Sequence, residues 1–294
     1  MRWLTAFLLT ASAAAQITTP IRNKLSAGDL PSAESILEVH ERDKGRDAHY
    51  LDGLVWVTRG AVLLGAWDRA ADLQAQLRAV LEEKLRAGAD PAKDNPLVAA
   101  LGAQIEVQAQ VLAHTNGRKS AVAYLDAELA RFSQPIGLRS RLYKRRNQLA
   151  LVGSAAPPLV VEESLSPNPP TLASLRGKPV LIFGWAQWCG DCRAQVAALG
   201  RIKAKYADKV AIITLTRFYE TDQTAEKALI NKVWAESYQP LQGAPILISA
   251  AAMERYGVSS TPTFILLDKN GKVAQYLPYR LTEAALDRLL LNLR

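Results

Sequence analysis

Apolar residues recur at helical spacing through the first half of the chain. From about residue 30 to residue 150 there are few runs of β-branched or alternating residues. Glycine, asparagine and proline interrupt the pattern at intervals. The pattern predicts six helices, over residues 30–43, 47–65, 67–87, 96–115, 118–132 and 137–150.

Three of the predicted turns carry a related motif. In residues 28–33 and 65–70, a glycine is followed two positions later by an apolar residue and five positions later by an alanine. Residues 116–121 are a looser copy of this motif. Small residues after a turn let neighbouring helices approach, as in helix-hairpin repeats of the tetratricopeptide kind. The rest of that consensus is poorly met, so a helical repeat and a generic antiparallel helical bundle both stay open.

The second half of the chain has a different pattern. Short apolar runs alternate with amphipathic stretches, and the Asn270-Gly271 pair marks a hairpin turn. Strands are expected over residues 179–184, 209–216, 245–249, 263–267 and 272–277, and helices over residues 190–206, 223–237 and 282–293. Strands that alternate with helices predict a parallel central sheet, to which the hairpin adds an antiparallel pair. The fold class is therefore α/β, preceded by an all-α domain.

Prolines and glycines gather between residues 153 and 170, where the helical pattern ends. Such a composition is typical of a linker or a domain boundary. We therefore place the linker at residues 150–156, with a helical domain over residues 16–150 and an α/β domain over residues 153–294.

The first fifteen residues have the features of a secretory signal peptide. Met1 and Arg2 precede a short apolar run, and Ala13 and Ala15 supply small residues for cleavage before Gln16. The run is well short of the roughly 20 apolar residues that a spanning helix needs. We expect residues 1–15 to be removed, the mature protein to be exported to the periplasm, and no membrane span to remain. A short N-terminal anchor is the alternative.

The chain of 294 residues carries a formal net charge of +8. A positive charge of this size is compatible with binding to nucleic acid or anionic lipid. Five basic residues gather in one predicted helix, namely Arg139, Arg141, Lys144, Arg145 and Arg146. Because an exported protein meets little nucleic acid, we interpret them as a solvated helix face and expect no nucleic-acid partner.

The chain contains only two cysteines, Cys189 and Cys192, between a predicted strand and a predicted helix. A thiol at a helix N-terminus lies beside unpaired N–H groups and the positive end of the dipole, which stabilise a thiolate. Two cysteines three residues apart in such a turn can close a short disulfide. Zinc needs four ligands, and the three histidines lie in the other domain. The pattern therefore indicates dithiol–disulfide chemistry, with no metal and no cofactor besides the redox-active disulfide.

Two motifs resemble the thioredoxin superfamily. Residues 188–192 read Trp-Cys-Gly-Asp-Cys, like its Trp-Cys-x-x-Cys turn between a strand and a helix, and residues 260–264 read Ser-Thr-Pro-Thr-Phe, like its cis-proline segment. Residues 153–158 and 172–179, with the extra helix and strand between the motifs, are similar to the extracytoplasmic TlpA/ResA branch. The resemblance implies a thioredoxin-like fold, in which helices flank a central mixed sheet.

The resemblance also implies roles for particular residues. Cys189 would be the attacking thiol and Cys192 the buried resolving thiol. Residues expected to support them or to contact the substrate are Trp188, Gly190, Asp191, Thr261 and Pro262. Protein thiols or disulfides would be the substrates, and a redox donor that the sequence does not identify would regenerate the dithiol.

The sequence departs from the family at three places. Thioredoxins have a buried acid six residues before the first cysteine, where this chain has Phe183. The TlpA/ResA branch often has a glutamate three residues after the second cysteine, where Gln195 stands, and Ala197 replaces the proline that kinks the helix. These departures leave open how a proton leaves Cys192, with solvent or Asp191 as the acceptor.

Asp191 has two interpretations. It can stabilise the first turn of the helix through the dipole, or its charge can oppose thiolate formation.

The leading hypothesis for the chain is an exported thiol–disulfide oxidoreductase that reduces protein disulfides. The alternatives are a periplasmic oxidase or isomerase, or an adaptor whose helical domain binds a partner. A peroxiredoxin fits less well, because residues 184–188 lack the motif that precedes the peroxidatic cysteine.

Overall fold

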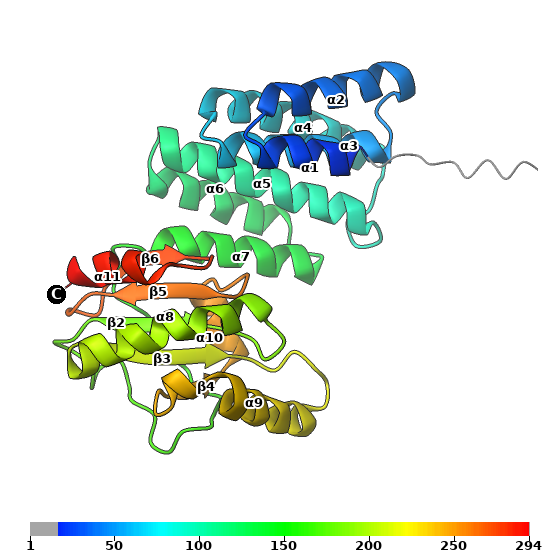
Figure 1. Ribbon diagram of the computed structural model, residues 1–294. Coiled ribbons are helices and arrows are strands. Elements are labelled where there is room, and N and C mark those ends of the chain that lie inside the picture. The colour runs from blue at the N-terminus through cyan, green and yellow to red at the C-terminus, as the bar shows by residue number, and fades with distance from the viewer. Residues whose placement is uncertain (1–16, 294) are drawn as a thin grey trace, which may run out of the picture. The chain divides into compact units, whose positions relative to one another are not determined.

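The computed structural model describes residues 17–293 (Figure 1), so the expected signal peptide, residues 1–15, lies outside the described residues. The chain divides into two compact units, one ending at Thr115 and the other beginning at Asn116. Within residues 17–293, no helix is long and apolar enough to cross a membrane.

The described part of the first unit is helical. Its helices are α1 (Thr18–Ser26), α2 (Leu30–Lys44), α3 (Ala48–Leu63), α4 (Trp67–Arg86) and α5 (Asn95–Thr115). The last four agree with the predicted helices to within one or two residues at each end, whereas α1 was not predicted. Aspartate side chains cap two of them: Asp29 accepts from the backbone N–H of Ser32 (3.1 Å) and Asp47 from that of Tyr50 (2.8 Å). These bonds satisfy helix N–H groups that lack a partner within the helix.

The three copies of the glycine–alanine motif share one local geometry. In residues 28–33, 65–70 and 116–121 the glycine has φ between 71° and 83°, and the alanine is fully buried. A positive φ is natural for glycine, and the small alanine lets the next helix pack closely. This geometry is compatible with a helical repeat, which stays a prediction.

Two glycines inside α3 bring it close to α1. A Cβ atom added at Gly60 would lie 2.9 Å or less from three side-chain atoms of Leu25, and one at Gly53 would lie 2.8 Å from Ile17. Glycine in a helix interior costs about 1 kcal/mol relative to alanine. Close helix packing therefore offsets the weak helix propensity at these positions.

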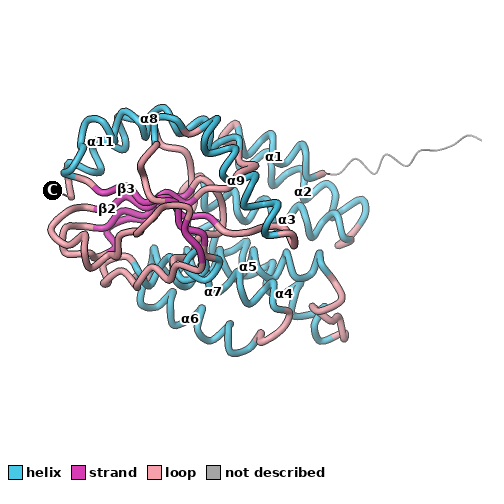
Figure 2. Tube along the Cα trace, turned by 90° about the horizontal axis from the view of Figure 1, so that it is seen from below, coloured by secondary structure: helices cyan, strands magenta, loops and turns pink. Residues whose placement is uncertain are grey.

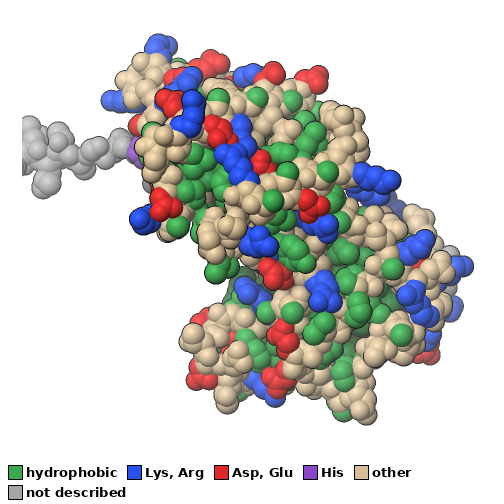
Figure 3. Space-filling view, turned by 180° about the vertical axis from the view of Figure 1, so that it is seen from behind, with side chains coloured by type: hydrophobic (Ala, Val, Ile, Leu, Met, Phe, Trp, Pro, Cys, Tyr) green, Lys and Arg blue, Asp and Glu red, His purple; other side chains and the backbone are tan. Residues whose placement is uncertain are grey.

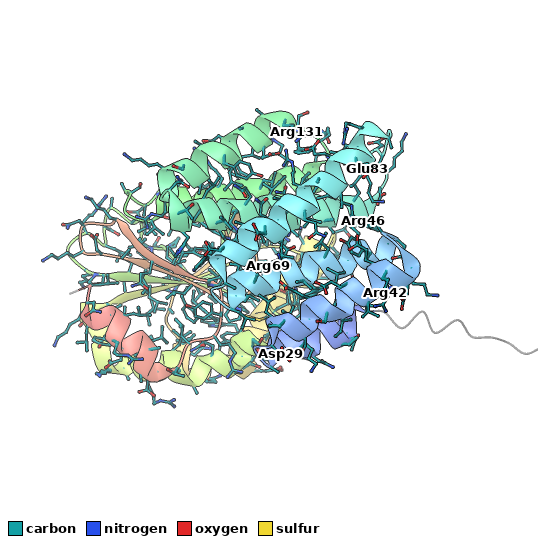
Figure 4. All side chains as sticks on the ribbon, turned by 90° about the horizontal axis from the view of Figure 1, so that it is seen from above. Asp29, Arg42, Arg46, Arg69, Glu83 and Arg131 are labelled. Atoms are coloured by element: carbon teal, nitrogen blue, oxygen red, sulfur yellow. A yellow bond between two sulfur atoms is a disulfide. The ribbon has the colours of Figure 1, made fainter. Side chains whose placement is uncertain are left out.

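Charged side chains of the first unit pair at its surface. Arg69 of α4 contacts Glu34 of α2 (2.8 Å), and Arg46 contacts Glu41 (2.7 Å), with Glu83 of α4 close by (Figure 4). On the face drawn in Figure 3, basic and acidic side chains are interspersed over the helices. Exposed pairs of this kind contribute about 1 kcal/mol or less each, so packing carries the stability of this unit.

The second unit contains a six-stranded mixed sheet of order β1-β4-β3-β2-β5-β6. The strands are β1 (Glu163–Ser164), β2 (Val180–Gly184), β3 (Ala211–Thr216), β4 (Ile246–Ile248), β5 (Thr263–Leu267) and β6 (Val273–Leu277). Strands β2, β3 and β4 are parallel, while β2–β5, β5–β6 and β1–β4 are antiparallel. The expected thioredoxin-like mixed sheet is therefore confirmed.

Helices cover both faces of this sheet (Figure 2). The helices of this unit are α6 (Arg118–Arg131), α7 (Ile136–Leu151), α8 (Gly190–Tyr206), α9 (Gln223–Ser237), α10 (Ala250–Arg255) and α11 (Glu283–Leu291). Alternate residues of β2 enter two different cores: Leu181 and Phe183 join the core beneath α8 and α11, and Val180 and Ile182 join the one beside α10. This two-sided burial explains why β2 reads as a continuous apolar run.

Helices α6 and α7 belong to the second unit, which differs from the linker expected at residues 150–156. Helix α7 packs against α10, where Ser140 donates to the Glu254 carboxylate (2.8 Å) and Asn147 donates to the Glu254 carbonyl (3.3 Å). The compact unit thus begins before the proline-rich stretch. Independent folding from residue 153 stays a prediction.

The basic cluster of α7 is not a simple solvated face. Lys144, Arg145 and Arg146 are half-buried. Arg146 pairs with Asp126 of α6 through both carboxylate oxygens (2.9 and 3.4 Å), and Arg145 donates to Gln148 (2.7 Å). The sequence interpretation was wrong on this point, because most of the cluster contributes to packing around α7.

Candidate active site: the dithiol turn

The two cysteines lie in the turn that joins β2 to α8. Cys189 is the N-cap of α8, and its Sγ accepts from the backbone N–H of Cys192 (3.1 Å). The two residues form a disulfide with their Cα atoms 5.2 Å apart. Cys189 is 4% exposed and Cys192 is fully buried. The helix starts where the sequence predicted, and one N–H group of its first turn, that of Cys192, bonds to the sulfur of Cys189.

The segment that contains the matched proline enters the sheet beside the end of β2, where the chain continues into the dithiol turn. Gly184, the last residue of β2, pairs with Thr263, the first residue of β5, in antiparallel register. Residues 257–262, here called the proline segment, therefore end beside the dithiol turn. The Thr261–Pro262 bond is cis, and Thr263 Oγ1 donates to the Ser260 carbonyl (2.7 Å). The structure thus brings together the two motifs that the sequence separates by about seventy residues.

An aromatic pair occupies the place of the family's buried acid. Phe183 pairs across the sheet with Phe264, and their ring centroids are 5.4 Å apart. Both side chains are fully buried. This stretch of the sheet therefore supplies packing beneath the cysteines and no titratable group.

Gln195 locks α8 to the loop before α11. Its Nε2 donates to the Leu281 carbonyl (2.8 Å), and its Oε1 accepts from the Leu281 N–H (2.8 Å). A carboxylate could accept one of these bonds but could not donate the other. The amide in place of the family's glutamate is therefore explained by a structural contact with one backbone residue.

Asp191 lies next to a cation that the sequence analysis did not anticipate. Arg280, from the loop before α11, places Nη1 3.7 Å from the Asp191 carboxylate, and both side chains are exposed. Arg193 Nη1 donates to the Gln187 carbonyl just before the cysteines (3.1 Å). A positively charged side chain therefore lies beside the acidic residue between the cysteines. Gly190 opens α8, and an added Cβ there would meet only Arg193, at 3.9 Å.

A buried carboxylate that sequence reasoning missed supports the turn. Glu226 of α9 is 2% exposed and accepts from Gln187 Nε2 (2.6 Å). It also accepts from the backbone N–H groups of Tyr219 (2.8 Å) and Glu220 (2.8 Å). Glu226 thereby ties the residue two before Cys189 to the loop after β3. In sequence it resembles an ordinary first-turn helix acid, so no local signal marked it.

Trp188 is the exposed aromatic residue beside Cys189. It is 58% exposed, and its ring meets that of Tyr219 edge-on at 5.4 Å. The Arg217 guanidinium lies over the Tyr219 ring, 4.5 Å from its centroid. Burial raises the pKa of Tyr219, against the lowering effect of Arg217. The side chains of Trp188, Tyr219 and Arg217 form a partly exposed surface next to the disulfide. Aromatic surfaces of this kind are suited to contact with a polypeptide.

Trp185 packs beneath the turn. It is fully buried, with ring centroids 4.7 Å from Tyr238 and 5.4 Å from Trp234. Burial raises the pKa of the Tyr238 hydroxyl. These aromatic side chains belong to the same buried core as the two cysteines.

No group of three His, Cys, Asp or Glu side chains within residues 17–293 could hold a metal ion.

Comparison with known proteins gives consistent matches for this part of the chain. Residues 151–282 match the Redoxin family. The chain is 31% identical over 122 residues to the thioredoxin-like protein YneN of Bacillus subtilis, covering 41% of this chain and 68% of the relative. It is 29% identical over 126 residues to the thiol-disulfide oxidoreductase ResA of Bacillus thuringiensis, covering 43% and 69%. Among solved structures, a thioredoxin-family thiol:disulfide interchange protein from Chlorobium tepidum aligns with a TM-score of 0.39 at 17% identity, over 47% of this chain and 94% of that chain.

Proposed function

The chain belongs to the ResA-like branch of the thioredoxin superfamily and is a thiol–disulfide oxidoreductase, and from this premise we propose that it reduces disulfides of exported proteins through Cys189 and Cys192. The observation that carries the proposal is the disulfide at the N-terminus of α8. The cis-proline segment joins β5 beside the end of β2, where the chain continues into the dithiol turn.

The proposed reaction transfers two electrons to the substrate. In the reduced enzyme the Cys189 thiolate attacks one sulfur of a protein disulfide, and the other substrate sulfur leaves as a thiolate that takes up a proton. Cys192 loses its proton to water or to Asp191, and its sulfur attacks the Cys189 side of the mixed disulfide. The substrate leaves as a dithiol, and the enzyme is left with the Cys189–Cys192 disulfide. A dithiol donor then reduces it.

Burial and capping support Cys189 as the attacking thiol. Cys189 is slightly exposed and next to the exposed Trp188, whereas Cys192 is fully buried one turn into α8. Cys189 Sγ also accepts a backbone N–H bond, and such bonds favour a thiolate in the reduced form.

Activity is tested by reduction of insulin disulfides with dithiothreitol as the donor. We expect the mature chain to be active and Cys189→Ser to lose roughly 10³-fold or more of the rate, because the nucleophile is removed. Cys192→Ser should instead accumulate a mixed disulfide with the substrate, which mass spectrometry detects. An inactive wild-type chain, or a Cys189→Ser variant with full activity, would contradict the proposal.

The proposed reducing direction rests on the two residues between the cysteines. Neither Gly190 nor Asp191 adds a positive charge between them, and a disulfide is a weaker oxidant when its thiolate is less stabilised. We expect a reduction potential below about −200 mV, nearer thioredoxin than a strong oxidase. Equilibration of the protein with glutathione or dithiothreitol measures it. A value near about −120 mV would favour the oxidase alternative.

Export is the remaining part of the proposal, and it rests on the sequence of residues 1–15. N-terminal sequencing of protein recovered from the periplasm of an expressing bacterium should begin near Gln16. Recovery of the chain only from the cytoplasm, with Met1 retained, would contradict export.

A further inference from the structure

Helix α7 holds the start of the proline segment through one buried side chain. Gln148 Nε2 donates to the Gly257 carbonyl (2.7 Å), with Ser259 Oγ and the Tyr276 hydroxyl oxygen each at 3.1 Å. Gln148 Oε1 accepts from Arg145 (2.7 Å). Both ends of the amide are therefore bonded, which fixes its orientation.

The Gly257 carbonyl receives two donors at this point. Besides Gln148, the Tyr276 hydroxyl donates to it at 2.7 Å. Burial raises the pKa of Tyr276, so its hydroxyl keeps the donated proton. Both lone pairs of one loop carbonyl are thus used by side chains from α7 and β6. A loop carbonyl bonded in this way has little freedom to rotate.

Gly257 also allows the segment to touch the backbone of α7. Its φ is +71°, and an added Cβ would lie 2.6 Å from the Lys144 carbonyl oxygen and 2.9 Å from Gln148 Cγ. Backbone cannot move away as a flexible side chain can. This position therefore requires glycine for both its conformation and its space.

The far end of the proline segment is fixed by the sheet. Thr263 pairs with Gly184 in the sheet. The side chain of Val258 packs against Gly184, and a Cβ atom added to this glycine would lie 3.3 Å from it. The residues held between these anchors are Ser259, Ser260, Thr261 and Pro262, of which the two serines are exposed. This stretch of the proline segment is therefore short and anchored on both sides.

From these contacts we infer that Gln148 is a positioning residue, which sets the backbone of the proline segment where an extended substrate docks beside Cys189. This inference rests on the proposed function, since it concerns how a polypeptide disulfide is held for attack. Gln148 lies on α7, before the proline-rich linker and therefore outside the α/β domain that the sequence predicted over residues 153–294. It acts through the proline segment, so it affects the docking of polypeptides and leaves the cysteine chemistry unchanged.

The test compares a polypeptide disulfide with a small one. Gln148→Glu keeps the size of the side chain and the bond from Arg145 but removes both donated hydrogens. We expect kcat/KM for insulin reduction to fall roughly tenfold, mainly through a higher KM, because a displaced docking segment misplaces the substrate. The rate with hydroxyethyl disulfide and the reduction potential should not change. Gln148→Ala should give the same pattern.

Asn147→Ala is the matched control. Asn147 lies next to Gln148 and bonds to the Glu254 carbonyl of α10, at the same helix contact but outside the proline segment. We expect this variant to keep the wild-type KM for insulin. Equal losses in the Asn147 and Gln148 variants, or equal losses with both substrates, would overturn the inference and indicate general destabilisation.

A second measurement separates this inference from the proposed function. If the wild-type chain does not reduce insulin, the proposed function fails, and hydrogen exchange then tests the positioning role by itself. The amides of Ser259 and Ser260 should exchange faster in Gln148→Glu than in Asn147→Ala. Equal exchange in the two variants would overturn the role of Gln148.

Discussion

Two buried glutamines, one in each unit, have different kinds of partner. In the first unit, Gln104 of α5 is buried and bonds to two side chains of α4, those of Gln74 (2.9 Å) and Arg78 (3.2 Å). In the second unit, Gln195 is equally buried and bonds to the backbone of Leu281 in a loop.

The difference follows from where the backbone needs partners. A helical unit satisfies nearly all of its N–H and C=O groups within its helices. The loops around the dithiol turn cannot do this, so single buried side chains such as Gln148 and Glu226 bond to them. The redox unit therefore depends on a few side chains in a way that the helical unit does not.

The largest effect should come from removing α6 and α7. A fragment of residues 116–294 should fold and keep dithiol activity, whereas residues 153–294 lose Gln148 and Asn147 with their hydrogen bonds to the carbonyls of Gly257 and Glu254. We expect the shorter fragment to be less stable by about 3 kcal/mol or more, since several buried partners are left unbonded. Urea denaturation of the two fragments measures this. Equal stability would support the predicted boundary at the proline-rich stretch.

Removing the Glu226 carboxylate should have the next largest effect. Glu226→Ala leaves the N–H groups of Tyr219 and Glu220 and the Gln187 amide without their acceptor. We expect a loss of about 3 kcal/mol in the free energy of unfolding, with slower insulin reduction because Gln187 precedes the cysteines. Glu236→Gln, an exposed change on the same helix, is the control and should stay within about 0.5 kcal/mol of wild type. A similar small loss in both variants would contradict a supporting role for Glu226.

The two buried glutamines allow a direct test of the comparison. Gln195→Leu strands a backbone N–H and a backbone C=O of Leu281, and we expect it to cost about 2 to 3 kcal/mol. Gln104→Leu leaves only the side chains of Gln74 and Arg78, which can turn toward water, and should cost about 1 kcal/mol or less. Thermal unfolding of each variant, followed separately for the two units, measures both. A larger cost for Gln104→Leu would reverse the conclusion.

The smallest effect concerns acid stability at the start of α10. Glu162 accepts from the N–H of Ala251 (2.9 Å) and of Ala250 (3.2 Å) and from the hydroxyl of Ser249 (3.1 Å), and these bonds, Ala251 first, hold its pKa below the ordinary value of 4.5. A lowered pKa stabilises the fold above the unfolded value and loses that contribution as pH falls through the folded value. Because Glu162 is exposed, we expect Glu162→Gln to cost only about 0.5 kcal/mol at pH 7.

Measurement of unfolding free energy from pH 7 to pH 3 checks the sign. The wild-type chain and Glu162→Gln should converge below the ordinary pKa of 4.5. A difference that grows as the pH falls would show that the carboxylate is not the stabilising form.

Local sequence patterns predicted the parts of the site that are close together in the chain. The Cys-x-x-Cys turn, the strand before it and the helix that begins at Gly190 all follow from spacing and residue type. The cis-proline position came from a family motif, and the structure confirms the cis bond at Thr261–Pro262. Helices of the first unit were also well predicted, because caps and glycine turns are local signals.

The supporting contacts could not be predicted, because their partners are far apart in sequence. Glu226 and Gln187 are 39 residues apart, Gln195 and Leu281 are 86 apart, and Gln148 and Gly257 are 109 apart. None of these glutamines or acids differs in sequence context from a surface helix residue. Only the fold shows which of them lie beside loop backbone.

The pair of Asp191 and Arg280 changes how the residues between the cysteines should be compared with those of other redox proteins. Arg280 is next to Leu281, so the lock made by Gln195 also fixes the loop from which the arginine reaches Asp191. Asp191 of the Gly-Asp dipeptide is therefore one member of a charge pair, and its partner lies almost ninety residues downstream. A ranking of such enzymes by the two residues between the cysteines alone would count the negative charge of Asp191 and omit the positive charge of Arg280.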